Sequence, residues 1–388
     1  TNYVIRIINK AKGNDNTLNV TLDNVNIKAK NDAALSVEGA GNTTITLKGD
    51  NTLTSDGQHA GLEHNEKDYY GREDTGKLTI TSGNENGRNT GSLTATGSGA
   101  SAGIGSVWNT GKVSNSGAGT IEITGGDITA IGASDGAGIG SGTWATGETN
   151  ITISGTAKIN ARTDQGGAGI GSGSDATGNT NITISGGTIE NAQGGSGGAG
   201  IGGGKNSSGA TKIDISGNAL VYAHGNDGAA IGSGESSAGE TTITIHDTNT
   251  GKGVKSAFAY NGAGIGSGHY ASGKTHITIR NASVSSLESS TASTNNPGAG
   301  IGSGKRAKGN TDITIEGSTV KAVGGYGAAI GSGSYSTNAT DIEITGGTIN
   351  ASSYDGSGIG SGDSAKGDTD IKIKNSNVTA KGFIDVRY

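Results

Sequence analysis

The chain has 388 residues, a net charge of −6, 76 glycines, one proline and no cysteine. Its charges are scattered without basic runs, which argues against nucleic acid and anionic membranes as partners. No window approaches the roughly 18 apolar residues of a membrane span, so we expect no membrane insertion, and the lack of cysteine excludes thiol catalysis and disulfide bonds.

Residues 1–97 begin with short apolar patterns of period two, at 3–8, 18–22 and 25–27. This alternation predicts strands, which turns rich in Asn, Asp and Gly separate. We expect irregular N-terminal coils, including a cap over the first open edge. Because the strand pattern begins at once and no initiating methionine precedes it, we expect a fragment of a larger protein.

The stretch from His59 to Asp74 carries the densest set of ionisable side chains. Two carboxyl groups about 5–9.5 Å apart suit cleavage of a glycosidic bond, and a histidine could assist proton transfer. The residues that would serve as catalytic groups are Glu63, His64, Glu66 and Asp68. The stretch lacks the H-E-x-x-H frame of a zinc site. A solvated charged loop and a ligand-binding loop are the alternative interpretations.

Residues 98–388 are organised around the motif G-I-G-S-G, as at residues 138–142. Its central isoleucine recurs after gaps of 29 to 36 residues, at Ile104, Ile139, Ile170, Ile201, Ile231, Ile265, Ile301, Ile330 and Ile359. A single G-x-G would suggest a phosphate loop, whereas nine copies at a near-constant period indicate a structural repeat. Weaker echoes surround Leu35 and Leu62. We therefore expect one continuous, elongated domain.

Each repeat unit, such as residues 136–161, reads as three short strands joined by turns. A strand rises about 3.3 Å per residue, so a unit of about 30 residues can wrap once around a narrow three-sided core. The unit is too long for a left-handed β-helix of the hexapeptide type. We predict an all-β fold, a right-handed parallel β-helix (solenoid) of about 11 coils of about 30 residues, with three short strands per coil.

Side-chain alternation assigns the two faces of each strand. In residues 149–154, Ile151 and Ile153 are expected to point inward and Thr152 outward. The equivalent inward pairs are Ile182/Ile184, Ile213/Ile215, Ile243/Ile245, Ile277/Ile279, Ile313/Ile315, Ile342/Ile344 and Ile371/Ile373. Coils stacked about 4.8 Å apart would align these pairs into two isoleucine ladders, which would be the main stabilising contribution.

The same alternation applied to the glycine motif predicts Ala137, Ile139 and Ser141 inside. Glycines 138, 140 and 142 are then expected outside, which leaves an outer surface of nearly bare backbone. One interpretation is that a partner approaches this surface closely, and the other is that small residues satisfy the turns of a narrow coil.

Aromatic residues are scarce in the chain, yet they gather in the turns before and after the glycine motif. Rings stack on the apolar faces of sugars and polar neighbours bind the hydroxyls, so such rows suit sugar recognition. The candidate binding residues are Trp108, Trp144, Tyr260, His269, Tyr270, Arg306, Tyr326, Tyr335, Tyr354 and Asp355. Alternatively, these side chains only shield the ends of the ladders.

Two extended segments, residues 246–260 and 284–297, are expected to wall one side of the solenoid. Together with Tyr260, Tyr270 and Arg306 they would form a groove in the C-terminal half.

No cofactor is expected. The glycine motif lacks the Lys-Ser/Thr of a phosphate loop and the aspartate of calcium-binding G-G-x-G-x-D repeats. Calcium held between the turns at Asp135, Asp227 and Asp355 stays an alternative, although these turns lie on non-adjacent coils.

The repeated units, clearest at residues 167–192 and 328–351, resemble repeats in large surface proteins of Gram-positive and gut bacteria. The resemblance implies a β-helical adhesin or carbohydrate-binding domain that is extracellular, sits at the cell surface and is joined to other domains of a larger protein. The fold also overlaps with that of pectate lyases and other β-helical polysaccharide-active enzymes, whose catalytic residues match no positions here.

The sequence thus favours a non-catalytic adhesin that binds a polysaccharide or host glycan along one side of the helix. A polysaccharide hydrolase or lyase and a plain spacer that lifts another domain off the cell wall are the alternatives. Ice binding through the outward threonines at Thr152, Thr183, Thr244, Thr278 and Thr314 is a further hypothesis, which Asp214, Glu343 and Lys372 weaken by interrupting the row.

Overall fold

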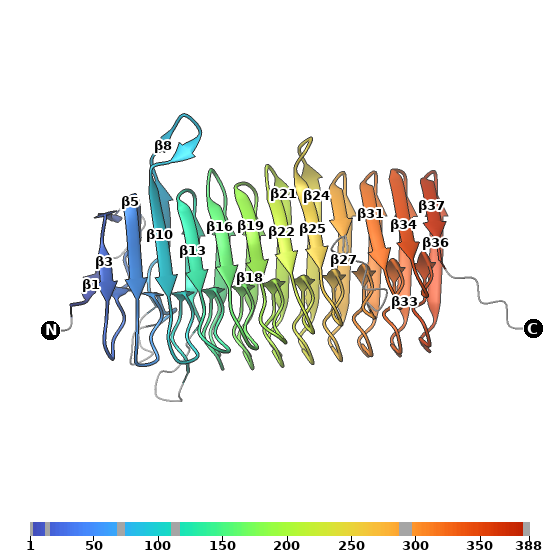
Figure 1. The fold of residues 1–388 in the computed structure, drawn as a ribbon, viewed down its shortest axis with the longest axis horizontal. Helices are drawn as coiled ribbons and strands as arrows, with labels where there is room; N and C mark the ends of the chain where they lie inside the picture. Colours follow the sequence, from blue (N-terminus) through green and yellow to red (C-terminus); the bar gives the residue numbers. More distant parts are fainter. Residues whose placement is uncertain (1–2, 12–15, 68–73, 110–116, 287–296, 383–388) are drawn as a thin grey trace, which may run out of the picture.

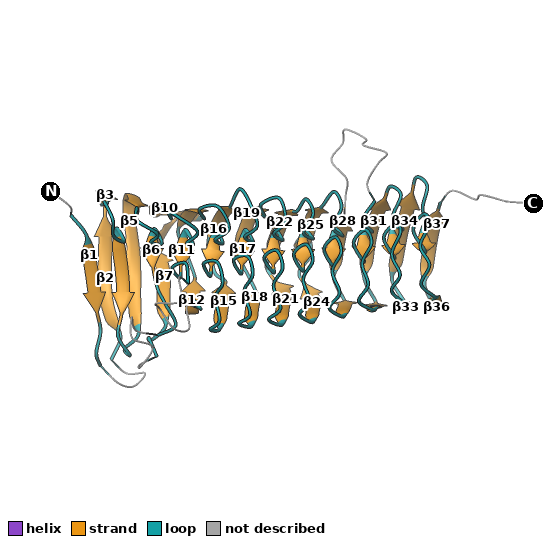
Figure 2. Cartoon of the chain, turned by 90° about the horizontal axis from the view of Figure 1, so that it is seen from below, coloured by secondary structure: helices purple, strands orange, loops and turns teal. Residues whose placement is uncertain are grey.

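The computed structural model describes residues 3–11, 16–67, 74–109, 117–286 and 297–382. These residues form an elongated stack of coils that follow one another in chain order along the long axis (Figure 1). They contain strands, turns and loops but no helix (Figure 2), so none of them builds a helix that could span a membrane. The predicted all-β solenoid is confirmed.

Three parallel sheets run the length of the stack, and each coil contributes to all three. The first, called the glycine sheet below, has twelve strands, in agreement with the expected number of about 11 coils. Its strands are β1 (Ile5–Ile8), β4 (Leu35–Glu38), β6 (Leu62–Glu63), β11 (Ile104–Gly105), β14 (Ile139–Gly140), β17 (Ile170–Gly171), β20 (Ile201–Gly202), β23 (Ile231–Gly232), β26 (Ile265–Gly266), β29 (Ile301–Gly302), β32 (Ile330–Gly331) and β35 (Ile359–Gly360).

The second sheet, called the isoleucine sheet, carries the paired isoleucines. Its strands are β2 (Leu18–Asp23), β5 (Thr43–Thr54), β7 (Leu78–Ser82), β12 (Gly119–Ile123), β15 (Thr149–Ile153), β18 (Thr180–Ile184), β21 (Thr211–Gly217), β24 (Thr241–Thr248), β27 (Thr275–Arg280), β30 (Thr311–Glu316), β33 (Thr340–Thr345) and β36 (Thr369–Lys374).

The third sheet follows the isoleucine sheet in each coil and shares β5 with it, because this long strand runs through the corner between them. The other strands of the third sheet are β3 (Asn26–Lys28), β10 (Gly91–Thr96), β13 (Asp127–Ile131), β16 (Lys158–Arg162), β19 (Thr188–Gln193), β22 (Leu220–His224), β25 (Gly253–Phe258), β28 (Ser283–Ser286), β31 (Thr319–Gly324), β34 (Thr348–Ser353) and β37 (Asn377–Lys381). A small antiparallel hairpin, β8 (Asn84–Glu85) and β9 (Arg88–Asn89), projects between β7 and β10.

The N-terminal coils continue the same register as the later ones. Leu35 pairs with Leu62, and Leu62 pairs with Ile104, so the two weak echoes of the motif do stand at the repeat position. Among the described residues, β1, β2 and β3 of the first coil pair only with strands of the second coil.

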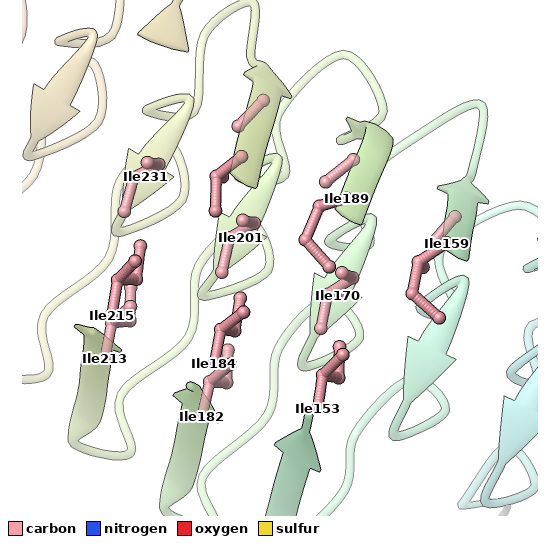
Figure 3. Packing of buried hydrophobic residues seen from close by; sticks show 14 of the residues in the cluster. Ile153, Ile159, Ile170, Ile182, Ile184, Ile189, Ile201, Ile213, Ile215 and Ile231 are labelled. Atoms are coloured by element: carbon pink, nitrogen blue, oxygen red, sulfur yellow. The ribbon is translucent and has the colours of Figure 1, made fainter. Parts of the chain in front are cut away.

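The core consists of apolar ladders that run through the stack (Figure 3). Ile151 pairs with Ile182 and Ile153 with Ile184, and both ladders continue in register through every later coil. From β15 to β33 these isoleucines are at most 2% exposed, as predicted. Burial of one isoleucine side chain contributes about 1.5–3 kcal/mol, so the ladders dominate the stability of the coils.

The last coil departs from the prediction of buried pairs. Ile371 and Ile373 continue the ladders in register but remain 41% and 44% exposed. Each coil buries its isoleucines against the coils on both sides, and no described coil follows β36.

The glycines of the motif do not form the expected bare outer surface, so this prediction was wrong. Ala137, Ile139 and Ser141 are buried as predicted, but the three glycines are buried too. The Ala137 N–H donates to the Ser141 carbonyl at 3.0 Å, and Gly140 has a φ of 132°, so this segment curls into a tight loop. Side-chain alternation applies only to extended backbone, which here covers just two residues per coil.

The loops stack so closely that a side chain at the glycine positions has no room. A Cβ on Gly140 would lie 1.8 Å from the Gly171 carbonyl oxygen of the next coil, and one on Gly142 would lie 2.3 Å from the Val107 oxygen of the previous coil. The serine between them also joins neighbouring coils, since the Gly173 N–H of the next coil donates to Ser141 Oγ at 3.1 Å. The glycines therefore permit close stacking of coils, which favours the structural interpretation of the motif.

The isoleucine ladder can be tested by comparing a central rung with the terminal one. Ile213→Ala is expected to lower the free energy of unfolding by about 2–5 kcal/mol, because it leaves a cavity in a closed core. Ile371→Ala removes the same atoms from a half-exposed rung and should cost much less. Equilibrium denaturation measures the free energy of unfolding of both variants. Equal losses of stability would contradict the conclusion that the buried ladders stabilise the coils.

The close stacking of the glycine loops predicts a second pair of effects. Gly251→Ala adds a Cβ at a φ of 77° with no atom within 4 Å, so only the left-handed backbone penalty of roughly 1–2 kcal/mol is expected. Gly171→Ala adds one at a φ of 141° and 1.9 Å from the Gly202 oxygen, and should destabilise considerably more. Thermal unfolding of the two variants separates backbone strain from steric exclusion.

Candidate functional site

The turns on either side of the glycine sheet form one continuous surface, which we call the rim. It comprises the residues four and five positions before and after each repeat isoleucine. Backbone hydrogen bonds join the two sides: the His269 N–H donates to the Asp227 carbonyl at 2.8 Å, and the Lys305 N–H donates to that of Asn261 at 2.8 Å. The two rows of candidate residues recognised in the sequence therefore lie next to each other.

One row of the rim has a left-handed backbone at a non-glycine residue in coil after coil. The residue five positions after the isoleucine has a φ of 58° at Trp144, 57° at Tyr270, 54° at Arg306 and 55° at Tyr335. A bulky residue rarely adopts this conformation, and a strained backbone is a reason to look for function. Trp108 and His269 belong to the neighbouring row, four positions after the repeat isoleucine.

The aromatic candidates form two groups along the rim. The rings of Trp108 and Trp144 lie 5.7 Å apart between centroids. Several coils further on, Arg306 lies between two tyrosines: its Cζ is 5.7 Å from the Tyr270 ring centroid and 5.8 Å from that of Tyr335. Its Nη1 also donates to the Tyr270 hydroxyl at 2.6 Å. An arginine side chain held between two aromatic rings is positioned to bind polar or anionic groups.

A groove of about 560 Å³ lies beside the rim, where strands of the third sheet end. Gln193, His224 and Phe258 occupy successive rungs of that sheet and line the groove. Tyr260 also lines the groove, and Asp164 lines it from an earlier coil. The groove therefore crosses four coils and combines two aromatic rings with amide, imidazole and carboxylate groups.

Of the groove residues named above, only Tyr260 was a candidate from the sequence. The others could have been found from one signal, since each of Gln193, His224 and Phe258 directly follows the inward alanine of its strand. Burial lowers the pKa of His224 below its usual value, which favours the neutral imidazole, a form that can both donate and accept a hydrogen bond.

Other candidates lie apart from the groove. Tyr326, Tyr354 and Asp355 belong to the last two coils of the rim. Asp135, Asp227 and Asp355 stand before β14, β23 and β35, so the structure does not gather them into a calcium site.

The turn of the first extended segment does not lie along the rim as expected. The turn of the segment 246–260 joins β24 to β25 and therefore projects from the corner between the isoleucine and third sheets, on the other side of the coil from the rim (Figure 1). Most of the segment 284–297 lies outside the described residues.

The charged stretch from His59 to Asp74 contains side chains with separate partners. Glu63 Oε2 pairs with His59 Nδ1 at 2.7 Å, and this bond raises the pKa of His59. Glu66 Oε2 accepts the Glu148 N–H at 2.9 Å, and burial raises the pKa of Glu66. Asp68 lies outside the described residues.

His64 links coils instead of facing a ligand. It is 1% exposed, and its Nδ1 and Nε2 lie 2.7 Å and 2.9 Å from the carbonyl oxygens of Ala118 and Gly76. Burial lowers the pKa of His64 and outweighs both carbonyls. A neutral imidazole donates only one of these bonds. Such a buried side chain cannot reach a polysaccharide, which removes the histidine from the hydrolase hypothesis.

Comparison with known proteins identifies the repeat. Five segments match the family described as Beta helix repeat, at residues 121–143, 151–174, 182–205, 313–334 and 342–363. Each segment runs from the first inward isoleucine of an isoleucine-sheet strand to the turn after the following glycine-sheet strand. No match was found among curated proteins or among solved structures. The comparisons thus support the architecture and name no activity.

The lowered pKa of His64 predicts a pH dependence. The unfolded chain binds a proton near pH 6.5 but the folded chain resists it, so the wild-type protein loses stability as pH falls through this value. His64→Gln cannot be protonated, so its stability deficit relative to wild type should shrink between pH 7.5 and 5.5. Thermal unfolding of both proteins across this pH range measures the deficit, and His276→Gln, which changes a more exposed histidine, is the control. A stability deficit of His64→Gln that stays constant with pH would contradict the lowered pKa of His64.

Proposed function

We propose that this β-helix is a non-catalytic binding module of a bacterial cell-surface protein and that it binds a glycan chain in the groove beside the rim. The observation that carries the proposal is the groove itself, which crosses successive coils and is lined by Phe258 and Tyr260 beside Gln193, His224 and Asn226.

The groove matches the chemistry of a sugar chain. Aromatic faces bind the apolar faces of sugar rings, and amide and imidazole groups bind hydroxyls. Successive coils repeat about every 4.8 Å, so the groove presents similar positions at regular intervals, as an extended chain of repeating sugars requires. The Tyr270–Arg306–Tyr335 stack on the same rim offers a second, cationic contact for a longer or acidic glycan.

The non-catalytic part of the proposal rests on the charged groups. A glycosidase needs two carboxyl groups that both face the scissile bond. Glu63 binds His59 and Asn65, while Glu66 binds the backbone of Glu148. The groove contributes a single carboxylate, Asp164.

A glycan array followed by calorimetry with the best ligand tests the proposal. Phe258→Ala and Tyr260→Ala should each weaken binding about tenfold or more, which corresponds to roughly 1.4 kcal/mol. Tyr354→Ala removes an exposed tyrosine of the rim that lies outside the groove, and it should leave the affinity unchanged.

Two outcomes would contradict the proposal. An array without any bound glycan, or full affinity in both groove variants, would remove the groove as the binding site. Release of reducing ends from the bound polysaccharide would instead support the hydrolase or lyase alternative.

A further inference from the structure

We propose that Asp227, Glu235 and His269 form a binding site for a divalent transition-metal ion such as Zn²⁺. The site lies on the rim but does not depend on glycan binding.

The stacking of coils brings these three side chains together from separate turns. Asp227 and Glu235 stand four residues before and after Ile231, and His269 stands four residues after Ile265 in the next coil. The His269 N–H donates to the Asp227 carbonyl at 2.8 Å, and the His269 carbonyl accepts the Ser236 N–H at 2.8 Å. One ligand atom from each side chain lies within 4.8 Å of the others, close enough for all three to approach one ion after small side-chain rotations.

The His269 ring is the feature that points to an ion. Both of its nitrogens are buried and neither has a hydrogen-bond partner within the described part of the chain. Asp227 Oδ1, the nearest carboxylate oxygen, is 3.8 Å from Nδ1, too far for a hydrogen bond. Tyr270 covers the ring, with centroids 3.9 Å apart. Buried polar atoms are normally satisfied, and a metal ion would use the free lone pair of this imidazole.

The neighbouring groups supply the support that a metal site needs. Asn261 Nδ2 donates to Asp227 Oδ1 at 2.6 Å and orients that carboxylate, as outer groups around metal ligands do. Lys205 Nζ pairs with Glu235 Oε2 at 2.9 Å, and its side chain is 41% exposed. This ammonium competes with an ion for Glu235, and its exposed side chain can turn to solvent when an ion binds.

The donor set indicates the class of metal. One imidazole nitrogen and two carboxylates suit Zn²⁺ and similar ions, whereas Ca²⁺ takes six to eight oxygen ligands. Among the described residues, this is the set of three His, Asp or Glu side chains whose ligand atoms converge.

Calorimetric titration of the whole chain with ZnCl₂, MnCl₂ and CaCl₂ tests the site. We expect one Zn²⁺ per chain, weaker Mn²⁺ binding and no Ca²⁺ binding. Asp227→Asn and His269→Gln should each weaken Zn²⁺ binding by tenfold or more, and Lys205→Gln should strengthen it because the competing ammonium is gone. Zn²⁺ should also raise the Tm of the wild type, since it binds the folded state.

His246→Gln is the matched control. His246 also lies beside two carboxylates, with Nε2 3.2 Å from Asp214 and Nδ1 3.0 Å from Asp247, but Arg280 shares Asp247 at 2.9 Å. This variant should bind Zn²⁺ like the wild type. A wild-type titration without binding, or unchanged affinity in both Asp227→Asn and His269→Gln, would overturn the proposal. Weaker binding after Lys205→Gln would overturn it too, and the Tm values without metal identify any variant that fails to fold.

Discussion

The structure depends on one constraint, the register between neighbouring coils. Each coil lies directly on the next, so a residue meets its own counterpart one repeat away, as Ile151 meets Ile182. A like side chain in every coil therefore forms a ladder that is buried on all sides, and a glycine in every coil permits backbones to approach to distances that exclude a Cβ. A change in one inner coil therefore disturbs the coils on both sides of it.

The same constraint leaves the side chains of the turns free to vary, and the candidate sites lie at these variable positions. The position five residues after the repeat isoleucine keeps a left-handed backbone from Trp144 to Ser364, yet its side chains differ from coil to coil. The scaffold fixes where each side chain stands and the sequence of the turn decides its chemistry. The groove residues Gln193, His224 and Phe258 follow the same rule, since they share one rung position with three different side chains.

Two histidines of the chain have different structural roles. Burial lowers the pKa of both His64 and His269. His64 lies against two backbone carbonyls and joins separate coils, which is a structural use of a buried imidazole. His269 is covered by Tyr270, and its nitrogens remain without partners next to Asp227 and Glu235. The contrast depends on the neighbours that the coils supply, not on the residue type.

The sequence by itself determined the architecture, because a period of about 30 residues and an alternation of two survive in the order of residues. The isoleucine ladders and even the weak echoes at Leu35 and Leu62 follow from that order. The sequence could not determine the conformation of the glycine motif, because alternation presumes extended backbone and Gly140 leaves it. Nor could it bring Asp227, Glu235 and His269 together or join Gln193 to Phe258. These contacts cross from coil to coil, and only the stacked structure decides which turns become neighbours.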